Sequence, residues 1–222
     1  MGATPLFRRV DLGYLERKLV LEGRPSKIRV VSGARVGAGD AARKALEEAS
    51  RRPLGLGRRR LAVEGVKLYY YPYWIYTVEF SIRALPLWRL SRHEATLSVD
   101  GVNGHTTFAD RPPSWEWREA SGDELVKLFV DGRTADRLAD VELPKLAALS
   151  LGGHIVSVKK RSRMLVYKPI WVVVAREEAS GRRVAAIVDA LTWGVGVVWY
   201  PRGRRMPEVF EDARRSGAPP TL

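Results

Sequence analysis

Cysteine and the amide side chains are the rarest features of this 222-residue chain. There is no cysteine at all, which excludes disulfide bonds, thiolate metal sites and cysteine nucleophiles. There is also no glutamine, and Asn103 is the only asparagine. Because side-chain amides are heat-labile, their depletion in a chain with 28% charged residues predicts a hyperthermophilic source.

Long hydrophobic runs are missing as well. The first ten residues, MGATPLFRRV, lack the apolar stretch of a secretion signal. The most apolar segment, Val184–Tyr200, contains Asp189 and is shorter than a membrane-spanning helix requires. We therefore expect a cytoplasmic protein without a membrane span.

The residue types of familiar catalytic and metal sites do not cluster in the sequence. His93, His105 and His154 are scattered, and none has a second ligand at the short spacing of a helical metal site. No Gly-x-Ser-x-Gly segment marks a hydrolase nucleophile. We predict no metal, no cofactor and no enzymatic activity.

Two features leave alternatives open. The glycine-rich segment Gly33–Asp40 suits a phosphate loop, but its strand ends too early and no acidic residue follows at the required spacing. An ordinary turn and helix start is the better interpretation. Asp100 and Asp189 each follow a valine, at equivalent places in the two halves. They could form a pair of carboxylates for acid–base catalysis. The interpretation favoured here is that each carboxylate accepts hydrogen bonds from backbone N–H groups at the start of a turn.

The net charge is strongly positive. Lys and Arg total 38 against 25 Asp and Glu, a net charge of +13, and Arg outnumbers Lys about three to one. A basic chain favours acidic partners such as nucleic acid or an anionic membrane. The alternative is that the charge only keeps the protein soluble.

One segment, Lys67–Phe80 (KLYYYPYWIYTVEF), is the longest strand-like run, and Arg163–Arg176 (RMLVYKPIWVVVAR) echoes it. Pro72 matches Pro169 and Trp74 matches Trp171. In a pleated strand alternate side chains share a face, so we place the proline–tryptophan face of both segments in the core. Because proline cannot donate to a ladder, each segment should carry an edge position or a bulge at its proline.

Local patterns predict the remaining elements. Helices are expected over residues 11–21 and 41–51 (with Asp40 as N-cap), from the capping box Ser121–Glu124, from Thr134, and from Pro144 to Gly152–Gly153. Strands are expected over 27–32, 61–63, 94–99, 106–108, 154–158 and 183–189. Four connections are expected between these elements: a type I′ turn at Asn103–Gly104, a Pro- and Trp-rich loop at Arg111–Glu119, a basic turn at Lys159–Arg163 and a hairpin turn at Ser180–Gly181.

Together these patterns predict an α+β fold of two internally repeated units, each a helix packed on an antiparallel sheet. Residues 1–110 form the first repeat with an N-terminal extension, 111–133 connect, 134–200 form the second repeat, and 201–222 form a basic, partly disordered tail.

Two hairpin segments carry a family resemblance. Trp171–Ala175 with Ala186–Thr192 resembles the hairpin of the PepSY or cystatin-like arrangement, in which a helix packs on a curved antiparallel sheet. The segment VDALTWG places Trp193 where the family has glycine, and the first half matches through VDGVNG at Val99–Gly104. The resemblance covers about a quarter of the chain and implies a fold only.

Arginine clusters flank the two similar segments, Lys67–Phe80 and Arg163–Arg176. In Lys67–Phe80, three tyrosines line the face opposite the proline–tryptophan face, and these tyrosines have no counterparts in Arg163–Arg176. A tyrosine face with an arginine rim is typical of platforms that stack single-stranded bases. The predicted nucleic-acid-binding residues are Arg58, Arg59, Arg60, Tyr69, Tyr71, Tyr73, Lys159, Lys160, Arg161 and Arg163. We thus expect a non-catalytic protein that binds single-stranded DNA or RNA. The alternative is a homodimeric interaction or structural module whose partner covers the tyrosine face.

Overall fold

The computed structural model describes residues 26–33, 36–51, 58–84, 89–109, 112–149, 154–200 and 208–215. The strands are β1 (Ser26–Val31), β2 (Leu61–Ala84), β3 (Arg89–Asp100), β4 (Thr106–Ala109), β5 (Trp115–Ala120), β6 (His154–Glu177), β7 (Arg183–Asp189) and β8 (Val195–Tyr200). The α-helices are α1 (Ala38–Ser50), α2 (Gly132–Leu149) and α3 (Glu208–Arg215), with a short 3-10 helix η3 (Gly122–Glu124). The helix expected at residues 11–21 lies outside the described residues.

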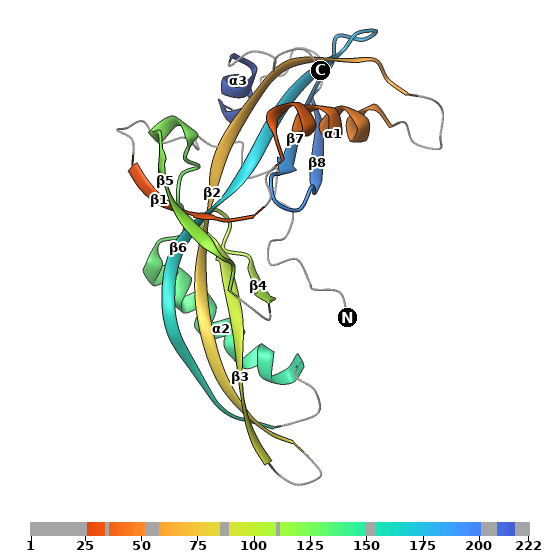
Figure 1. The fold of residues 1–222 in the computed structure, drawn as a ribbon. Helices are drawn as coiled ribbons and strands as arrows, with labels where there is room; N and C mark the ends of the chain where they lie inside the picture. The colour runs from red at the N-terminus through yellow and green to blue at the C-terminus, as the bar shows by residue number, and fades with distance from the viewer. Residues whose placement is uncertain are drawn as a thin grey trace.

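Two long strands form the spine of the molecule (Figure 1). β2 and β6 have 24 residues each and pair antiparallel along their whole length. At about 3.3 Å per residue each would extend roughly 80 Å if straight, and both curve strongly in Figure 1. The described strands form one eight-stranded mixed sheet in the order β4-β3-β2-β6-β1-β5, with β7 also on β6 and β8 on β7.

The predicted fold class is therefore wrong. The protein is predominantly β, with one large mixed sheet and three α-helices among the described residues, and it does not divide into two α+β units. The reason is that β2 and β6 pair with each other, which joins the strands of both halves into one sheet. Residues 111–133, expected to be a connection, contribute β5 to the same sheet by pairing with β1.

Each proline of the spine lies where a neighbouring strand stops. β3 ends with Asp100 opposite Tyr73, and β7 ends with Asp189 opposite Ile170. Pro72 directly precedes Tyr73, and Pro169 directly precedes Ile170. The missing N–H group of each proline therefore falls just past the last residue pair of the β2–β3 or β6–β7 ladder. The β2–β6 register shifts lie elsewhere, so the edge position is confirmed and the bulge is not.

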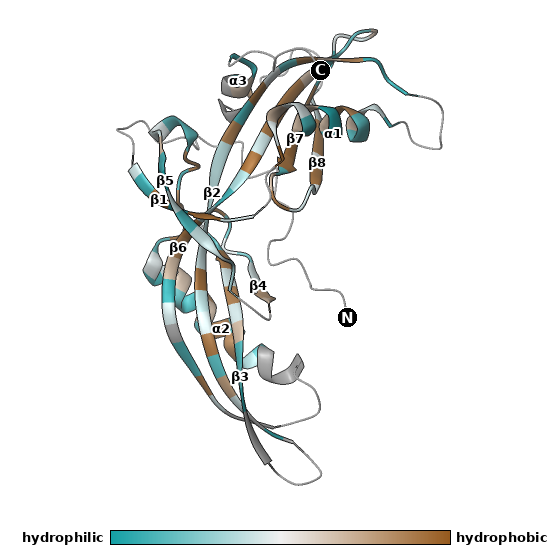
Figure 2. Cartoon of the chain, in the orientation of Figure 1, coloured by the Kyte–Doolittle hydropathy of each residue, from teal (hydrophilic) through white to brown (hydrophobic). Residues whose placement is uncertain are grey.

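Helices cover both faces of the spine. α1 and α2 pack at opposite ends of one face, α1 against Trp171 and Val173, and α2 against Tyr76 and Val78. α3 packs on the other face through Phe210. Figure 2 shows that β7 and β8, which α1 covers, are almost continuously apolar. No described helix is long and apolar enough to cross a membrane.

The C-terminal segment differs from its prediction. Residues 208–215, expected within a partly disordered tail, form α3, whose Phe210 and Ala213 are completely buried. The helix lies so close to Gly65 of β2 that a Cβ there would be 2.0 Å from the Ala213 carbonyl oxygen. Gly65 is thus required by close packing, a signal that strand patterns do not show.

Three other local predictions are wrong. Pro144 lies inside α2 rather than at the start of a further helix. Lys159–Arg163 belongs to β6 and is no turn. Asp40 lies in the first turn of α1, whose N-cap is Gly37, and accepts a hydrogen bond from Arg43 at 2.5 Å. The strands predicted at 27–32, 106–108 and 183–189 are confirmed within two residues as β1, β4 and β7. The strand predicted at 94–99 is confirmed as the C-terminal half of β3.

Candidate functional site

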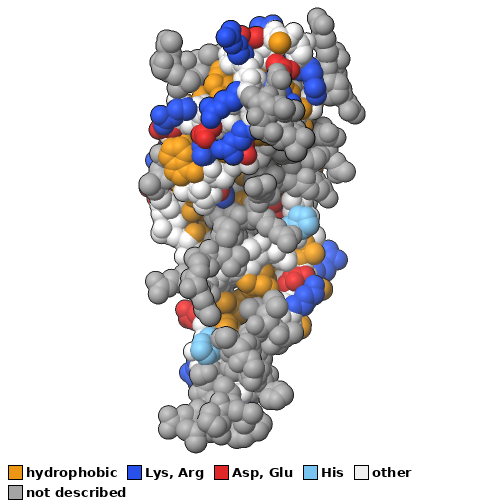
Figure 3. Space-filling view, turned by 90° about the vertical axis from the view of Figure 1, so that its right-hand side faces the viewer, with side chains coloured by type: hydrophobic (Ala, Val, Ile, Leu, Met, Phe, Trp, Pro, Cys, Tyr) orange, Lys and Arg blue, Asp and Glu red, His pale blue; other side chains and the backbone are white. Residues whose placement is uncertain are grey.

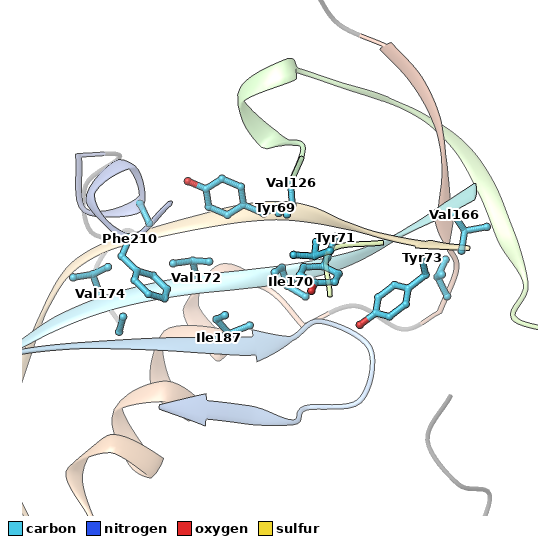
Figure 4. Packing of buried hydrophobic residues seen from close by; sticks show 14 of the residues in the cluster. Tyr69, Tyr71, Tyr73, Val126, Val166, Ile170, Val172, Val174, Ile187 and Phe210 are labelled. Carbon is cyan, nitrogen blue, oxygen red and sulfur yellow. The ribbon is translucent and has the colours of Figure 1, made fainter. Parts of the chain in front are cut away.

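The three tyrosines predicted to stack bases lie in the core. Tyr69 and Tyr71 are completely buried and Tyr73 is 3% exposed. They belong to one buried cluster with Ile170 and Val172 of β6, in which Figure 4 shows Tyr71 beside Ile170. A buried ring has no free face for a base, so this part of the predicted site is corrected: the tyrosine face is covered by the protein's own helix and strands.

A buried polar cluster accompanies the tyrosines. The Tyr71 hydroxyl donates to both carboxylate oxygens of Asp100 at 3.0 and 3.1 Å. Lys168, directly opposite Tyr71 in the β2–β6 ladder, forms an ion pair with Asp189. Burial raises the pKa of Asp100 and lowers the pKa of Lys168, although Asp189 opposes the second shift. Burial, and then the nearby Asp100 and Asp189 charges, raise the pKa of Tyr73.

Both aspartates hold a turn at the end of a strand. Asp100 accepts backbone N–H groups from Val102 and Asn103 at 2.8 and 3.1 Å. Asp189 accepts the corresponding groups from Leu191 and Thr192 at 2.9 and 3.2 Å. The prediction that these carboxylates bond turn backbone is confirmed. The first turn is not type I′, because Gly104 has a positive φ of 76° and Asn103 does not.

The predicted basic residues do not come together. Arg60 precedes β2 at one end of the spine, while Lys159 pairs with Glu79 near the other end. The 18 positions between Leu61 and Glu79 correspond to roughly 60 Å at 3.3 Å per residue, shortened by the curvature of the strand. No short ligand can contact both groups.

At the α2 end, the basic side chains are engaged within the chain. Arg163 contacts Asp136 at 2.6 Å and donates to the Gly132 carbonyl at 3.0 Å. Lys160 contacts Asp140 at 2.6 Å. These pairs fasten α2 to β6 and offer little free positive charge. Lys159 is exposed, and the side chain of Arg161 lies outside the described set.

At the α1 end, the basic side chains are partly available. Arg58 and Arg60 are exposed, whereas Arg59 stacks over Trp199 at 4.4 Å and lies 3.5 Å from Glu177. Figure 3 shows Lys and Arg side chains gathered on the upper part of the visible face, at the height of α1, β7 and β8.

Two exposed aromatic residues lie together elsewhere, on β5. Trp115 is 39% exposed and Trp117 is 49% exposed, and their rings meet edge to face with centroids 5.7 Å apart. The nearby prolines predict a loop in this segment, and the structure shows strand β5 instead. The alternation of Trp, Glu, Trp, Arg and Glu at Trp115–Glu119 was the available signal, because residues two apart share one strand face.

Two cations of β1 lie on the same face as these tryptophans. Arg29 is opposite Trp117 in the β1–β5 ladder, and its guanidinium lies 4.8 Å from the Trp117 ring and 5.2 Å from the Trp115 ring. The Lys27 ammonium lies 5.7 Å from the Trp117 ring. We call Lys27, Arg29, Trp115 and Trp117 the tryptophan surface.

Within the β1–β5 pair, the acidic residue on the same face as the tryptophan surface is Glu119, which is opposite Lys27. Glu116 points to the other face and accepts from Arg118 at 2.7 Å. The surface therefore combines two partly exposed indole rings with two cations that lie over them. Such a set can bind a flat anionic ligand by stacking and charge attraction.

The described residues contain no group of three or more His, Cys, Asp or Glu that could hold a metal ion. No protein-family model matches the chain, and no curated protein or solved structure matches it either. The resemblance of the Trp171 and Val188 hairpin to PepSY modules therefore stays a prediction.

Proposed function

We propose that the chain is a non-catalytic protein that binds single-stranded DNA or RNA through the tryptophan surface. The observation that carries the proposal is the exposed Trp115–Trp117 pair with Arg29 over both rings. The site thus moves from the buried tyrosines of β2 to the edge of the sheet.

The energetics favour unpaired bases. Stacking a base on an aromatic side chain contributes about 1–3 kcal/mol and tolerates any base, because every base has a π-face. Lys27 and Arg29 supply cations for adjacent phosphates, and the net charge of +13 attracts the strand from a distance. Bases stacked inside a duplex cannot reach the tryptophan rings, so single strands should bind more tightly than duplexes.

The first test is a titration of a fluorescent 12-nucleotide oligonucleotide with the full chain and with a Trp115→Ala, Trp117→Ala variant. Loss of two stacking residues, at about 1 kcal/mol or more for each base, should weaken binding at least about 30-fold at every salt concentration. Equal affinity of the variant and the unaltered chain would contradict the proposed site. Absence of binding at low salt would contradict the function itself.

The salt dependence tests the cations separately. Each phosphate neutralised on a single strand contributes about 0.7 to the slope of log affinity against log salt. Lys27→Ala with Arg29→Ala should therefore reduce the slope by up to about 1.4. The matched control is Lys160→Ala with Arg163→Ala, which removes the same charge from residues already paired with α2. Equal slope changes in both variants would mean nonspecific attraction only.

The homodimer remains the second candidate, and one observation favours it. Among the described residues β5 pairs only with β1, and a strand at the end of a sheet can pair with a strand of a second copy. Sedimentation at low micromolar concentration separates the two functions. A salt-insensitive dimer without affinity for oligonucleotides would support the homodimer and contradict the nucleic-acid proposal.

A further inference from the structure

Trp193 has an unusual backbone conformation. It is the only non-glycine residue with a positive φ in the described part of the chain, at 60°, and its side chain is 45% exposed. A bulky residue in this region is uncommon, because its Cβ crowds the backbone. Such an outlier persists where the surrounding structure enforces it, and it justifies a hypothesis of function.

The surrounding turn enforces this conformation. The N–H of Trp193 donates to the Asp189 carbonyl at 3.1 Å, and the N–H of Asp189 donates to the Gly194 carbonyl at 2.8 Å. The turn at Asp100 has the same two bonds, and there the left-handed position is filled by Gly104. Glycine is therefore the relaxed residue for this shape, and the backbone gives no reason for a tryptophan.

The β7–β8 turn lies beside the tryptophan surface. On the same edge of β6, β1 pairs through Val30 at Tyr167, and β7 pairs through Asp189 at Ile170. These β6 positions are three residues apart, roughly 10 Å at 3.3 Å per residue. β1 runs parallel and β7 antiparallel to β6, so their C-terminal ends face each other, as Figure 1 shows.

Two contacts place Trp115 and Trp193 on either side of this junction. Trp115 is opposite Val31, the last residue of β1, so β5 begins there. Leu191, two residues before Trp193, packs against the cluster that contains Val31. The backbone N–H of Val36 donates to the Ala190 carbonyl at 3.0 Å, which fastens the turn to the segment after β1.

We propose that Trp193 is a third stacking residue, so that single-stranded nucleic acid runs along Trp117 and Trp115 and crosses the junction to the β7–β8 turn. This inference rests on the proposed function. β1 and β7 pair with β6 positions that are roughly 10 Å apart, and β5 lies one strand further from β6 than β1 does. A strand must then be longer than the few nucleotides that the first two tryptophans hold before it reaches Trp193.

The test replaces Trp193 with the residue that suits the turn. Trp193→Gly in the full chain should leave the thermal midpoint unchanged or raise it, because the left-handed strain is relieved. It should weaken binding of a dT12 oligonucleotide at least about fivefold and leave binding of dT4 unchanged. The control is Phe129→Ala, which removes an aromatic residue that is 40% exposed and that lies beside the Asp100 turn. It should change neither affinity.

The outcomes separate this inference from the proposed function. If Trp193→Gly binds dT12 like the unaltered chain while the Trp115→Ala, Trp117→Ala variant does not, the third stacking residue is wrong and the proposed function stands. If Trp193→Gly and Phe129→Ala weaken binding equally, the effect is not specific to Trp193 and the inference is also wrong. If the unaltered chain binds neither oligonucleotide at low salt, both proposals fail.

Discussion

The tyrosines of β2 and the tryptophans of β5 share a sequence pattern and differ in almost everything else. Both sets are aromatic residues spaced two apart beside cations: Lys67 lies 5.3 Å from the Tyr69 ring, and Arg29 lies 4.8 Å from the Trp117 ring. β2 lies between β3 and β6, whereas β5 ends the sheet order. The comparison shows that position in the sheet decides whether such a pattern forms core or surface.

The largest expected effect is on the buried side of this comparison. Tyr71→Ala with Tyr73→Ala should abolish cooperative folding, because each buried aromatic truncation costs about 3–5 kcal/mol and a domain has about 5–15 kcal/mol in total. Denaturant unfolding followed by circular dichroism measures this. Trp115→Ala with Trp117→Ala is the matched control on the exposed strand and should remain folded.

A milder variant, Tyr71→Phe, tests the buried tyrosines even if the Tyr71→Ala, Tyr73→Ala variant does not fold. It removes only the hydroxyl that donates to Asp100, and it should cost about 1–3 kcal/mol of unfolding free energy. Unchanged stability in both tyrosine variants would contradict the buried cluster.

An effect smaller than that of the double tyrosine variant is expected from matched lysines. Lys168→Met should destabilise the fold by about 3–5 kcal/mol, because it leaves the largely buried Asp189 without its cation. The exposed Lys27→Met should change stability by less than about 0.5 kcal/mol and weaken oligonucleotide binding instead. Denaturant midpoints and oligonucleotide titrations of both variants give the comparison. Similar losses of stability would mean that Lys168 is not buried in solution.

The smallest effect is a difference in pH dependence between a buried and an exposed carboxylate. Burial raises the pKa of Asp100 in the folded state, so its contribution to stability is most favourable below its unfolded pKa near 3.8 and declines as pH rises through the raised value. The stability of the unaltered chain relative to Asp100→Asn should therefore increase as pH falls toward 3.

Asp131 is the exposed counterpart, with the opposite sign. The Thr134 N–H donates to it at 2.7 Å and lowers the pKa of this carboxyl. Its contribution is present above pH 3.8 and declines as pH falls through the lowered value, so the advantage over Asp131→Asn should shrink toward acid pH. Thermal midpoints at a series of pH values measure both differences, and equal signs would contradict the account.

Much of the strand pattern could be predicted from the sequence, because alternation and turn residues are local signals. The strand through Tyr71 and Trp74, the turn at Gly181 and the carboxylate turns at Asp100 and Asp189 are examples. What could not be predicted is the pairing of β2 with β6, which determines that Tyr71 is buried, since pairing depends on contacts nearly a hundred residues apart.

The candidate site shows the same limit. The arginines were predicted as one rim because they flank echoing segments, yet a curved spine separates Arg60 from Lys159. Arg163 is predicted to bind phosphate because the sequence does not reveal which acidic residue lies next to it. In the structure Arg163 forms an ion pair with Asp136 of α2. The sequence around Trp115 and Trp117 predicts a loop because prolines lie nearby, whereas the structure forms strand β5 there.

The most direct measurement is ultraviolet cross-linking of a bound oligonucleotide to the full chain, followed by mass spectrometry of the modified peptides. If the tryptophan surface binds nucleic acid, the cross-links should map to the peptide that contains Trp115 and Trp117. They should disappear when a competing unlabelled single strand is added. Cross-links confined to Arg58–Arg60 or Lys159–Arg163, with none on β5, would contradict the account.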